Sequence, residues 1–197
     1  MRYVLAVLLL LGLAGPAAAL TAAEEAEVER LRAYLTDLTT MEATFQQVDN
    51  NGNIASGEFW LHRPHRLRFE YDPPNPILIV ARGSFLVHYD KELNETHYLD
   101  QDDTPAWFLL SEQVQIGNEI TVENVSREGA YISITARQTG REDQGAITLI
   151  FRHDPIQLVG WRMTDQAGNQ VRLSLTAQET GGEIDPELFQ FRPTEYE

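Results

Sequence analysis

Apolar and polar residues alternate along most of the chain, and the clearest example is the stretch 66–71. Leu67, Phe69 and Tyr71 alternate there with charged residues. Because successive side chains of a β-strand point to opposite faces of a sheet, this pattern predicts a strand with one apolar face. It follows a strand that ends near Arg63-Pro64, since proline has no N–H group to donate to a central ladder.

The same one-sided pattern recurs almost to the end of the chain. Turn residues (Gly, Pro, Asn and Asp) recur about every ten residues between the apolar runs, as in an antiparallel meander. We count about eleven strands, predicted over residues 42–49, 56–63, 66–72, 77–80, 85–89, 95–99, 120–125, 131–138, 146–152, 158–164 and 171–178.

Two segments depart from this pattern and predict helices. Residues 22–38 carry Val28, Leu31, Leu35 and Leu38 at helical spacing, after a capping box formed by Thr21 and Glu24. Residues 104–110 begin with Thr-Pro and continue as an apolar run, which predicts a short, buried helix. The fold class is therefore mainly β, with an N-terminal helix and a short mid-chain helix.

A sheet of this width must curl, because ordinary sheets have roughly four to six strands. Its apolar inner face must then be covered. The two predicted helices can cover the interior of such an open barrel, and the space beneath them favours an apolar ligand. The alternative is a barrel or sandwich filled by its own side chains, and the pattern alone leaves both interpretations open.

Composition narrows the function classes. The 197 residues include 30 acidic and 15 basic side chains, for a net charge of −15, and no cysteine. The negative surface disfavours binding to nucleic acid or anionic lipid headgroups. Without cysteine the chain has no disulfide, thiol nucleophile or thioether-linked lipid anchor.

The first residues resemble a secretory signal peptide. Arg2 precedes an apolar run over residues 4–13, Pro16 ends that run, and Ala17-Ala18-Ala19 forms an A-x-A cleavage box. We expect cleavage after Ala19, one mature domain over residues 20–197, and a mature protein that is free in an exported compartment.

Motifs for catalysis or metal binding do not stand out. The five histidines lack the spacing of a metal site, and no nucleophile elbow, P-loop or dinucleotide fingerprint occurs. We expect no catalytic residue, no metal and no cofactor. A hydrolase whose catalytic pair comes together from distant positions remains an alternative.

The chain resembles the family of periplasmic outer-membrane lipoprotein carriers, LolA. The resemblance covers nearly the whole chain after residue 19 and rests on the order and spacing of several short motifs. These are Phe45-x-Gln47, Gly57-x-Phe59, Arg63-Pro64, Phe69-x-Tyr71-x-x-Pro74, the apolar segment 105–110, Ile184-Asp185 and Phe189-x-Phe191.

The resemblance implies an open antiparallel barrel lidded by helices, and a function as carrier. Such a carrier accepts lipid-modified proteins from an inner-membrane ABC exporter, shields their acyl chains and delivers them to the outer membrane. It hands them to a receptor lipoprotein there, where one exists. That receptor shares the fold but has a lipidated cysteine, so the cysteine-free chain matches the soluble carrier, which we expect to be a monomer.

By position, Arg63 matches the family arginine that hydrogen-bonds the lid backbone and holds the empty cavity shut. Leu67 falls where a large apolar residue is needed for accepting cargo. The acyl-chain cavity is predicted to be lined by Phe59, Leu67, Phe69, Tyr71, Phe85, Trp107, Phe108 and Trp161. Arg66 and Arg68 are predicted to face solvent.

Two other functions use the same fold. One is a binding module that senses mislocalised lipoproteins and regulates another protein. The other is a carrier of free lipid, sterol or another hydrophobic molecule. Extraction of lipoprotein cargo from a membrane separates the carrier from both.

Overall fold

The computed structural model describes residues 20–104, 107–112, 120–141 and 145–192. The predicted signal peptide, residues 1–19, and Pro105 and Ala106 of the predicted mid-chain helix lie outside the described residues. The helices are α1 (Ala22–Asp37), the 3₁₀-helix η1 (Gln101–Asp103), α2 (Trp107–Leu110) and the 3₁₀-helix η3 (Pro186–Phe189).

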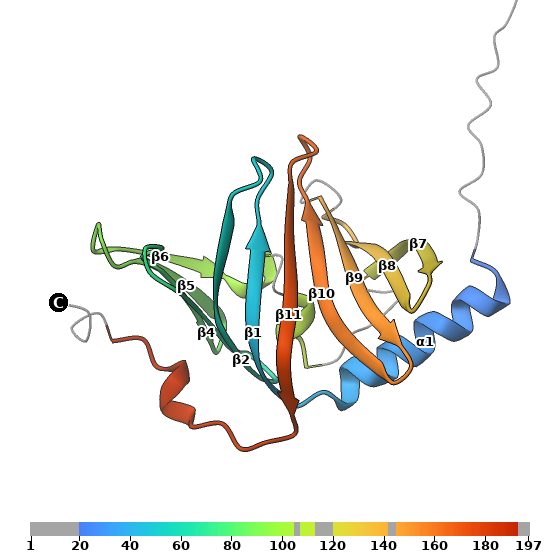
Figure 1. Cartoon of the computed structure of the whole chain (residues 1–197), viewed down its shortest axis with the longest axis horizontal. Helices are drawn as coiled ribbons and strands as arrows, with labels where there is room; N and C mark the ends of the chain where they lie inside the picture. Colours follow the sequence, from blue (N-terminus) through green and yellow to red (C-terminus); the bar gives the residue numbers. More distant parts are fainter. Residues whose placement is uncertain (1–19, 105–106, 113–119, 142–144, 193–197) are drawn as a thin grey trace, which may run out of the picture.

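In the described residues, eleven antiparallel strands form one sheet, in the order β6-β5-β4-β3-β2-β1-β11-β10-β9-β8-β7. The sheet curves around one side but does not close, because β6 and β7 lie at its two ends (Figure 1). The predicted open, mainly β fold is confirmed. The strands are β1 (Thr40–Val48), β2 (Ile54–His62), β3 (Arg66–Tyr71), β4 (Ile77–Arg82), β5 (Phe85–Asp90), β6 (Glu95–Asp100), β7 (Ile120–Glu128), β8 (Tyr131–Gln138), β9 (Ala146–His153), β10 (Ile156–Thr164) and β11 (Gln170–Thr180).

Helix α1 begins directly after the predicted capping box, and its apolar stripe faces the sheet. The side chains of Thr21 and Glu24 accept hydrogen bonds from each other's backbone N–H groups, which forms the predicted capping box. Val28, Leu31 and Leu35 are buried against the concave face of the sheet. Near its C-terminal end, the ring of Tyr34 meets Phe151 of β9 edge-on at 5.9 Å. The apolar stripe of the helix thereby covers the β9–β10 side of the interior.

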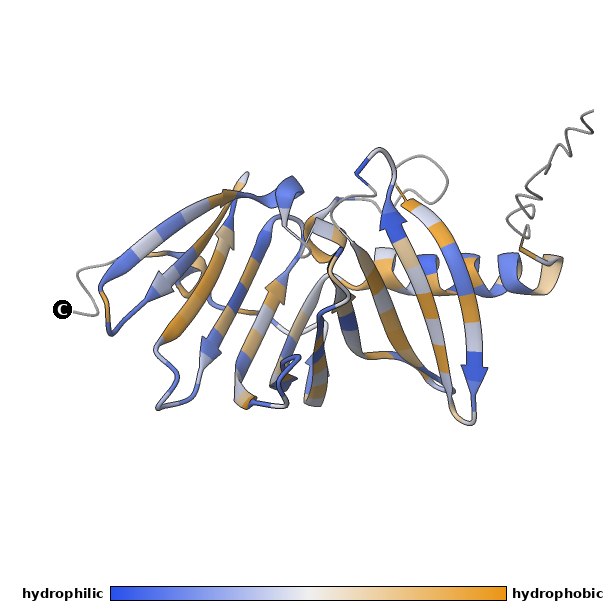
Figure 2. Cartoon of the chain, turned by 90° about the horizontal axis from the view of Figure 1, so that it is seen from above, coloured by the Kyte–Doolittle hydropathy of each residue, from blue (hydrophilic) through white to orange (hydrophobic). Residues whose placement is uncertain are grey.

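Apolar and polar residues alternate along the strands, as Figure 2 shows. On β3, Leu67, Phe69 and Tyr71 point into the interior, where they join the main hydrophobic core. Gly57 of β2 makes close packing possible there. A Cβ atom at this position would lie 2.0 Å from the carbonyl oxygen of Glu70 and 2.9 Å from the Phe45 ring. The motif glycine thus leaves room for an inward-facing aromatic ring.

Strands β4 and β5 are apolar on both faces, and their outer face is also covered. Leu78, Val80, Val87 and Tyr89 form a second, smaller core on that face, with Phe191 packed against it. The covering element is the C-terminal segment, residues 181–192, which runs back across the outside of the sheet (Figure 1). The sheet therefore has its main core on the concave face and a small one behind β4 and β5.

Candidate functional site

An apolar cavity of about 280 Å³ lies between the concave face of the sheet and the lid formed by η1 and α2. Strands from both halves of the sheet contribute side chains, and the lid contributes Phe108 and Leu109. The volume is near the lower limit for ligand pockets, which typically span roughly 300–1,000 Å³. The lining residues are Gln47, Leu67, Phe69, Tyr71, Ile79, Leu86, His88, Leu99, Asp103, Thr104, Phe108, Leu109, Trp161, Met163 and Leu173.

Aromatic rings from four elements meet at the centre of the interior. Trp161 of β10 has its ring centre 6.2 Å from that of Phe69 on β3 and 5.8 Å from that of Phe108 in the lid. Phe59 stacks on Phe69 at 4.6 Å. These edge-on and tilted contacts have the geometry that aromatic pairs favour, and they bury apolar surface from β2, β3, β10 and α2 together.

The cavity has few polar groups. Tyr71 donates a hydrogen bond from its hydroxyl to the side-chain oxygen of Gln47 at 2.8 Å. Burial raises the pKa of the Tyr71 phenol to about 12, so it stays a neutral donor. The cavity wall is mostly apolar, and the Tyr71 hydroxyl is already hydrogen-bonded. Such a wall suits a hydrocarbon ligand better than a polar one.

The lid is tied to the sheet on the β2–β3 side by backbone and side-chain hydrogen bonds. The N–H of His65 donates to the Leu110 carbonyl at 3.0 Å. The side-chain amide of Gln101, which is buried, donates to the carbonyls of His65 and Phe85 at 3.3 and 3.2 Å. These contacts fix both ends of the η1–α2 segment over the cavity.

Arg63, just after β2, connects both helices. Its Nη1 donates to the carbonyl oxygen of Leu35 in α1, and its Nη2 donates to that of Ser111, just after α2, at 2.8 Å. The side chain is buried, with the residue 8% exposed, and desolvation lowers its pKa. Terminal carbonyls of helices lack intrahelical partners and carry partial negative charge. The guanidinium supplies the cation that α1 lacks in its own last turn.

A second connection holds the lid on the opposite side. The Arg141 Nη1, near the β8–β9 turn, donates to the carboxylate of Asp103 and, at 3.2 Å, to the carbonyl of Asp102. Both side chains are partly exposed. The lid is thus held by a buried arginine on one side and by an exposed ion pair on the other.

The structure brings together most of the residues predicted to line the cavity. Leu67, Phe69, Tyr71, Phe108 and Trp161 line it. Phe59 is buried directly behind Phe69. Trp107 faces an adjoining pocket of about 130 Å³, which shares Asp103 and Met163 with the main cavity.

Phe85 does not lie in the cavity. Its neighbours in β5, Leu86 and His88, line the cavity, so the alternation of the strand turns Phe85 to the outer face. There it is 54% exposed and borders a groove with Phe189 and Phe191. The sequence pattern identified two faces of β5 without indicating which one is inside.

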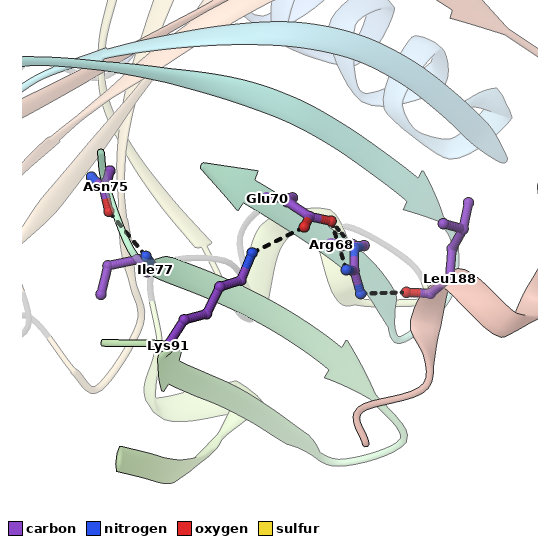
Figure 3. A network of polar contacts seen from close by, with 6 residues as sticks. All are labelled: Arg68, Glu70, Asn75, Ile77, Lys91 and Leu188. Carbon is purple, nitrogen blue, oxygen red and sulfur yellow. Dashed lines mark hydrogen bonds and ion pairs between the residues drawn. The ribbon is translucent and has the colours of Figure 1, made fainter. Parts of the chain in front are cut away.

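The prediction that Arg66 and Arg68 face solvent is wrong for Arg68, which is buried under the C-terminal segment. Its guanidinium binds the Glu70 carboxylate and donates to the carbonyl of Leu188 at 3.1 Å, while Lys91 binds Glu70 from the other side (Figure 3). Arg66 lies over the ring of Phe189 at 6.0 Å. Because the covering segment comes from more than 110 residues later, strand periodicity could not reveal these contacts.

The described part of the chain has no helix long and apolar enough to span a bilayer. Within the same residues, no group of three or more His, Cys, Asp or Glu side chains is placed to hold a metal ion.

An open antiparallel sheet that curves around an apolar cavity, with helices closing the mouth, defines a container for a hydrophobic ligand. The family model described as "Outer membrane lipoprotein carrier protein LolA" matches residues 36–192, and the chain belongs to this family.

Similar proteins agree with this assignment. An outer-membrane lipoprotein carrier protein of Methylococcus capsulatus is 31% identical, over 87% of this chain and 86% of the relative. One of Alkalilimnicola ehrlichii is 30% identical, over 91% and 85%. A solved structure of an outer membrane lipoprotein-sorting protein domain from Vibrio parahaemolyticus has a TM-score of 0.52 at 8% identity, over 85% of this chain and 97% of that one, and it supports the fold alone.

Proposed function

We propose that this protein is an exported carrier, cleaved after Ala19, that moves lipid-modified proteins through the periplasm. It accepts them from an inner-membrane ABC exporter and encloses their acyl chains in the cavity beneath η1 and α2. It then releases them at the outer membrane, to a receptor lipoprotein where one exists. The observation that carries the proposal is the apolar cavity closed by a lid whose attachments are a few hydrogen bonds.

The energetics suit a reversible carrier. Burying an acyl chain contributes about 0.8 kcal/mol per CH₂, so a sixteen-carbon chain represents on the order of 12 kcal/mol before costs. The bilayer offers a similar gain, so the carrier competes with it for cargo. Each hydrogen bond of the lid is worth roughly 1 kcal/mol net. Incoming hydrocarbon can therefore displace the lid contacts, and their re-formation favours release.

Arg63 is the residue proposed to hold the empty lid closed. It is buried, and its two hydrogen bonds reach α1 and the end of α2 at once. When cargo separates the helices from the rim, both bonds must break together. The bonds to Arg63 thus couple the positions of the two covering helices to occupancy of the cavity.

A release assay tests the proposal. Exporter proteoliposomes that carry a labelled lipoprotein are incubated with the mature protein and ATP, and the soluble fraction is examined for a one-to-one complex. We expect a soluble complex that requires both the protein and ATP. Absence of release, with the exporter active on its own carrier, would contradict the proposal. Lipid found by native mass spectrometry would then favour a carrier of free lipid.

A further inference from the structure

The cavity reaches the solvent along β6, the last strand at one end of the sheet. Leu99 of β6 lines the cavity and is nevertheless 45% exposed, so the apolar space continues to this edge. Asp103 and Thr104, which follow β6 in the chain, line the same end of the cavity. A molecule whose hydrocarbon part fills the cavity can therefore leave it beside the C-terminal half of β6.

Among the residues that the structure describes, none pairs with the outer edge of strand β6. It pairs with β5 on one side and is the terminal strand of the sheet on the other, and nearly all its residues are exposed. The N–H of Gln101 donates to the carbonyl of Ser84, one step beyond the pair Phe85–Asp100. Since hydrogen-bonded pairs alternate in an antiparallel ladder, His97 and Leu99 bond to β5. Thr96 and Tyr98 therefore turn their N–H and C=O groups toward the open edge, and Asp100, whose C=O caps η1, turns its N–H group there.

Charge around this edge is predominantly acidic. Glu92 and Glu95 are exposed at one end of β6, and Asp100 and Asp102 are exposed at the other. The nearby Lys91 is bound to Glu70, and His97 lies on the strand itself. An incoming segment with neutral or cationic side chains fits this edge, whereas an acidic one is repelled.

We propose that β6 receives the polypeptide of the cargo, as a twelfth, antiparallel strand. The occupant is the extended segment that follows the acylated residue, and the inference rests on the proposed function. With the acylated first residue in the cavity near Leu99, the chain continues toward Glu95, opposite to the direction of β6. Backbone hydrogen bonds to Thr96, Tyr98 and Asp100 are independent of cargo sequence, which suits a carrier of many proteins. The acidic ends select against acidic segments.

Two synthetic lipopeptides test this inference with the mature protein. One is a diacylated cysteine amide, and the other is the same group followed by eight Ser, Thr and Lys residues. We expect the longer lipopeptide to bind more tightly by at least roughly fivefold, the worth of one backbone hydrogen bond net of water. Replacing its lysines by glutamates should weaken binding at low salt, and high salt should reduce that difference.

Two variants at one position isolate the backbone donor. Tyr98→Pro removes an N–H that faces the open edge and leaves the ladder with β5 intact, since proline is tolerated on an edge strand. Tyr98→Ala removes the same exposed side chain but keeps the N–H. We expect Tyr98→Pro to lose the preference for the longer lipopeptide, with unchanged binding of the short one. Tyr98→Ala should keep the preference.

Amide hydrogen exchange on the unmodified protein gives an independent measurement. The longer lipopeptide should slow exchange at Thr96, Tyr98 and Asp100, and leave the β7 edge unchanged. Equal affinity for the two lipopeptides, without new protection in β6, would overturn the edge proposal and leave the carrier function standing. Failure of both lipopeptides to bind would instead overturn the proposed function on which it rests.

Discussion

The guanidinium of Arg63 donates to the carbonyl oxygen of Leu35, which lies 28 residues earlier in the chain and near the end of α1. The same guanidinium also binds Ser111, beyond α2. One buried side chain therefore satisfies carbonyls near the C-terminal ends of both covering helices. Since this contact involves a charged donor and a low-dielectric environment, its loss should affect lid position more than any other single contact of the lid.

Arg63→Leu should leave these two carbonyls without a donor and loosen the lid. We expect the free energy of unfolding to fall by about 2–4 kcal/mol, because unpaired buried polar groups are costly. An apolar fluorescent dye should bind the variant more strongly than the native protein. In the release assay the variant should retain cargo instead of delivering it.

Arg68→Leu is the matched control for Arg63→Leu. It removes a buried arginine that also donates to a distant carbonyl, but it loosens the C-terminal segment instead of the lid. The control should destabilise the fold without increasing dye binding in the cavity. Unchanged delivery of cargo to the receptor by Arg63→Leu would contradict the role of Arg63 in closing the lid.

Leu67 and Leu61 allow cavity contacts to be separated from core packing. They face each other across β2 and β3 and both are fully buried, but only Leu67 lines the cavity. Either change to alanine should lower the free energy of unfolding by about 2–5 kcal/mol. Only Leu67→Ala should also weaken acyl-chain binding, measured with the short lipopeptide. Equal loss of binding in both variants would indicate a general effect on the core.

The ion pair between Arg141 and Asp103 should contribute little. Both groups are partly exposed, and exposed pairs are typically worth about 0–1 kcal/mol. Arg141→Ala should therefore change unfolding and cargo retention only slightly, and the change should disappear at high salt. A loss as large as that of Arg63→Leu, measured by urea unfolding at two salt concentrations, would show that the two attachments of the lid are equivalent.

The C-terminal segment should loosen in acid through Glu70. Burial raises the pKa of this carboxyl, but hydrogen bonds from Arg68 and Lys91 outweigh it and hold the pKa below its ordinary value of 4.5. As the pH falls, the unfolded chain takes up the proton first. The stabilisation is therefore complete above the ordinary pKa and is lost as the pH falls through the lowered one.

The Glu70→Gln variant measures how much the charged Glu70 carboxylate contributes to stability. At pH 7 it should lower the thermal midpoint, and the difference from the native protein should shrink below pH 4.5. Glu58→Gln, directly across the ladder from Glu70, is the control and should have little effect. A difference between native protein and Glu70→Gln that does not change with pH would exclude the carboxylate as its source.

Much of the fold was predictable because local patterns determine it. Period-two alternation identified the strands, and the Thr21–Glu24 capping box fixed the start of α1. Five of the eight predicted cavity residues line the cavity, since β3, β10 and α2 carry apolar side chains on the side that faces inward.

The remaining errors both concern the outer face of the sheet, and each has its own physical cause. Phe85 belongs to a strand that is apolar on both sides, so periodicity gives no preference for either direction. Arg68 was predicted to face solvent because charged and apolar residues alternate along β3. Instead, the side chain is buried and donates to the carbonyl of Leu188 in the C-terminal segment. Contacts between residues more than 100 positions apart leave no periodic signal, and such a contact decides the case of Arg68.

The order of the strands has a consequence for folding. Every pair of neighbours in the sheet is consecutive in sequence except β1 and β11, where Phe45 lies opposite Leu175. The meanders β1–β6 and β7–β11 can each form from local pairings. The pairing of β1 with β11 joins residues far apart in sequence, and such non-local contacts slow folding. Before β11 is in place, β1 and β10 each present an open apolar edge, which favours aggregation. The most vulnerable period for this chain is therefore the interval before β11 is inserted.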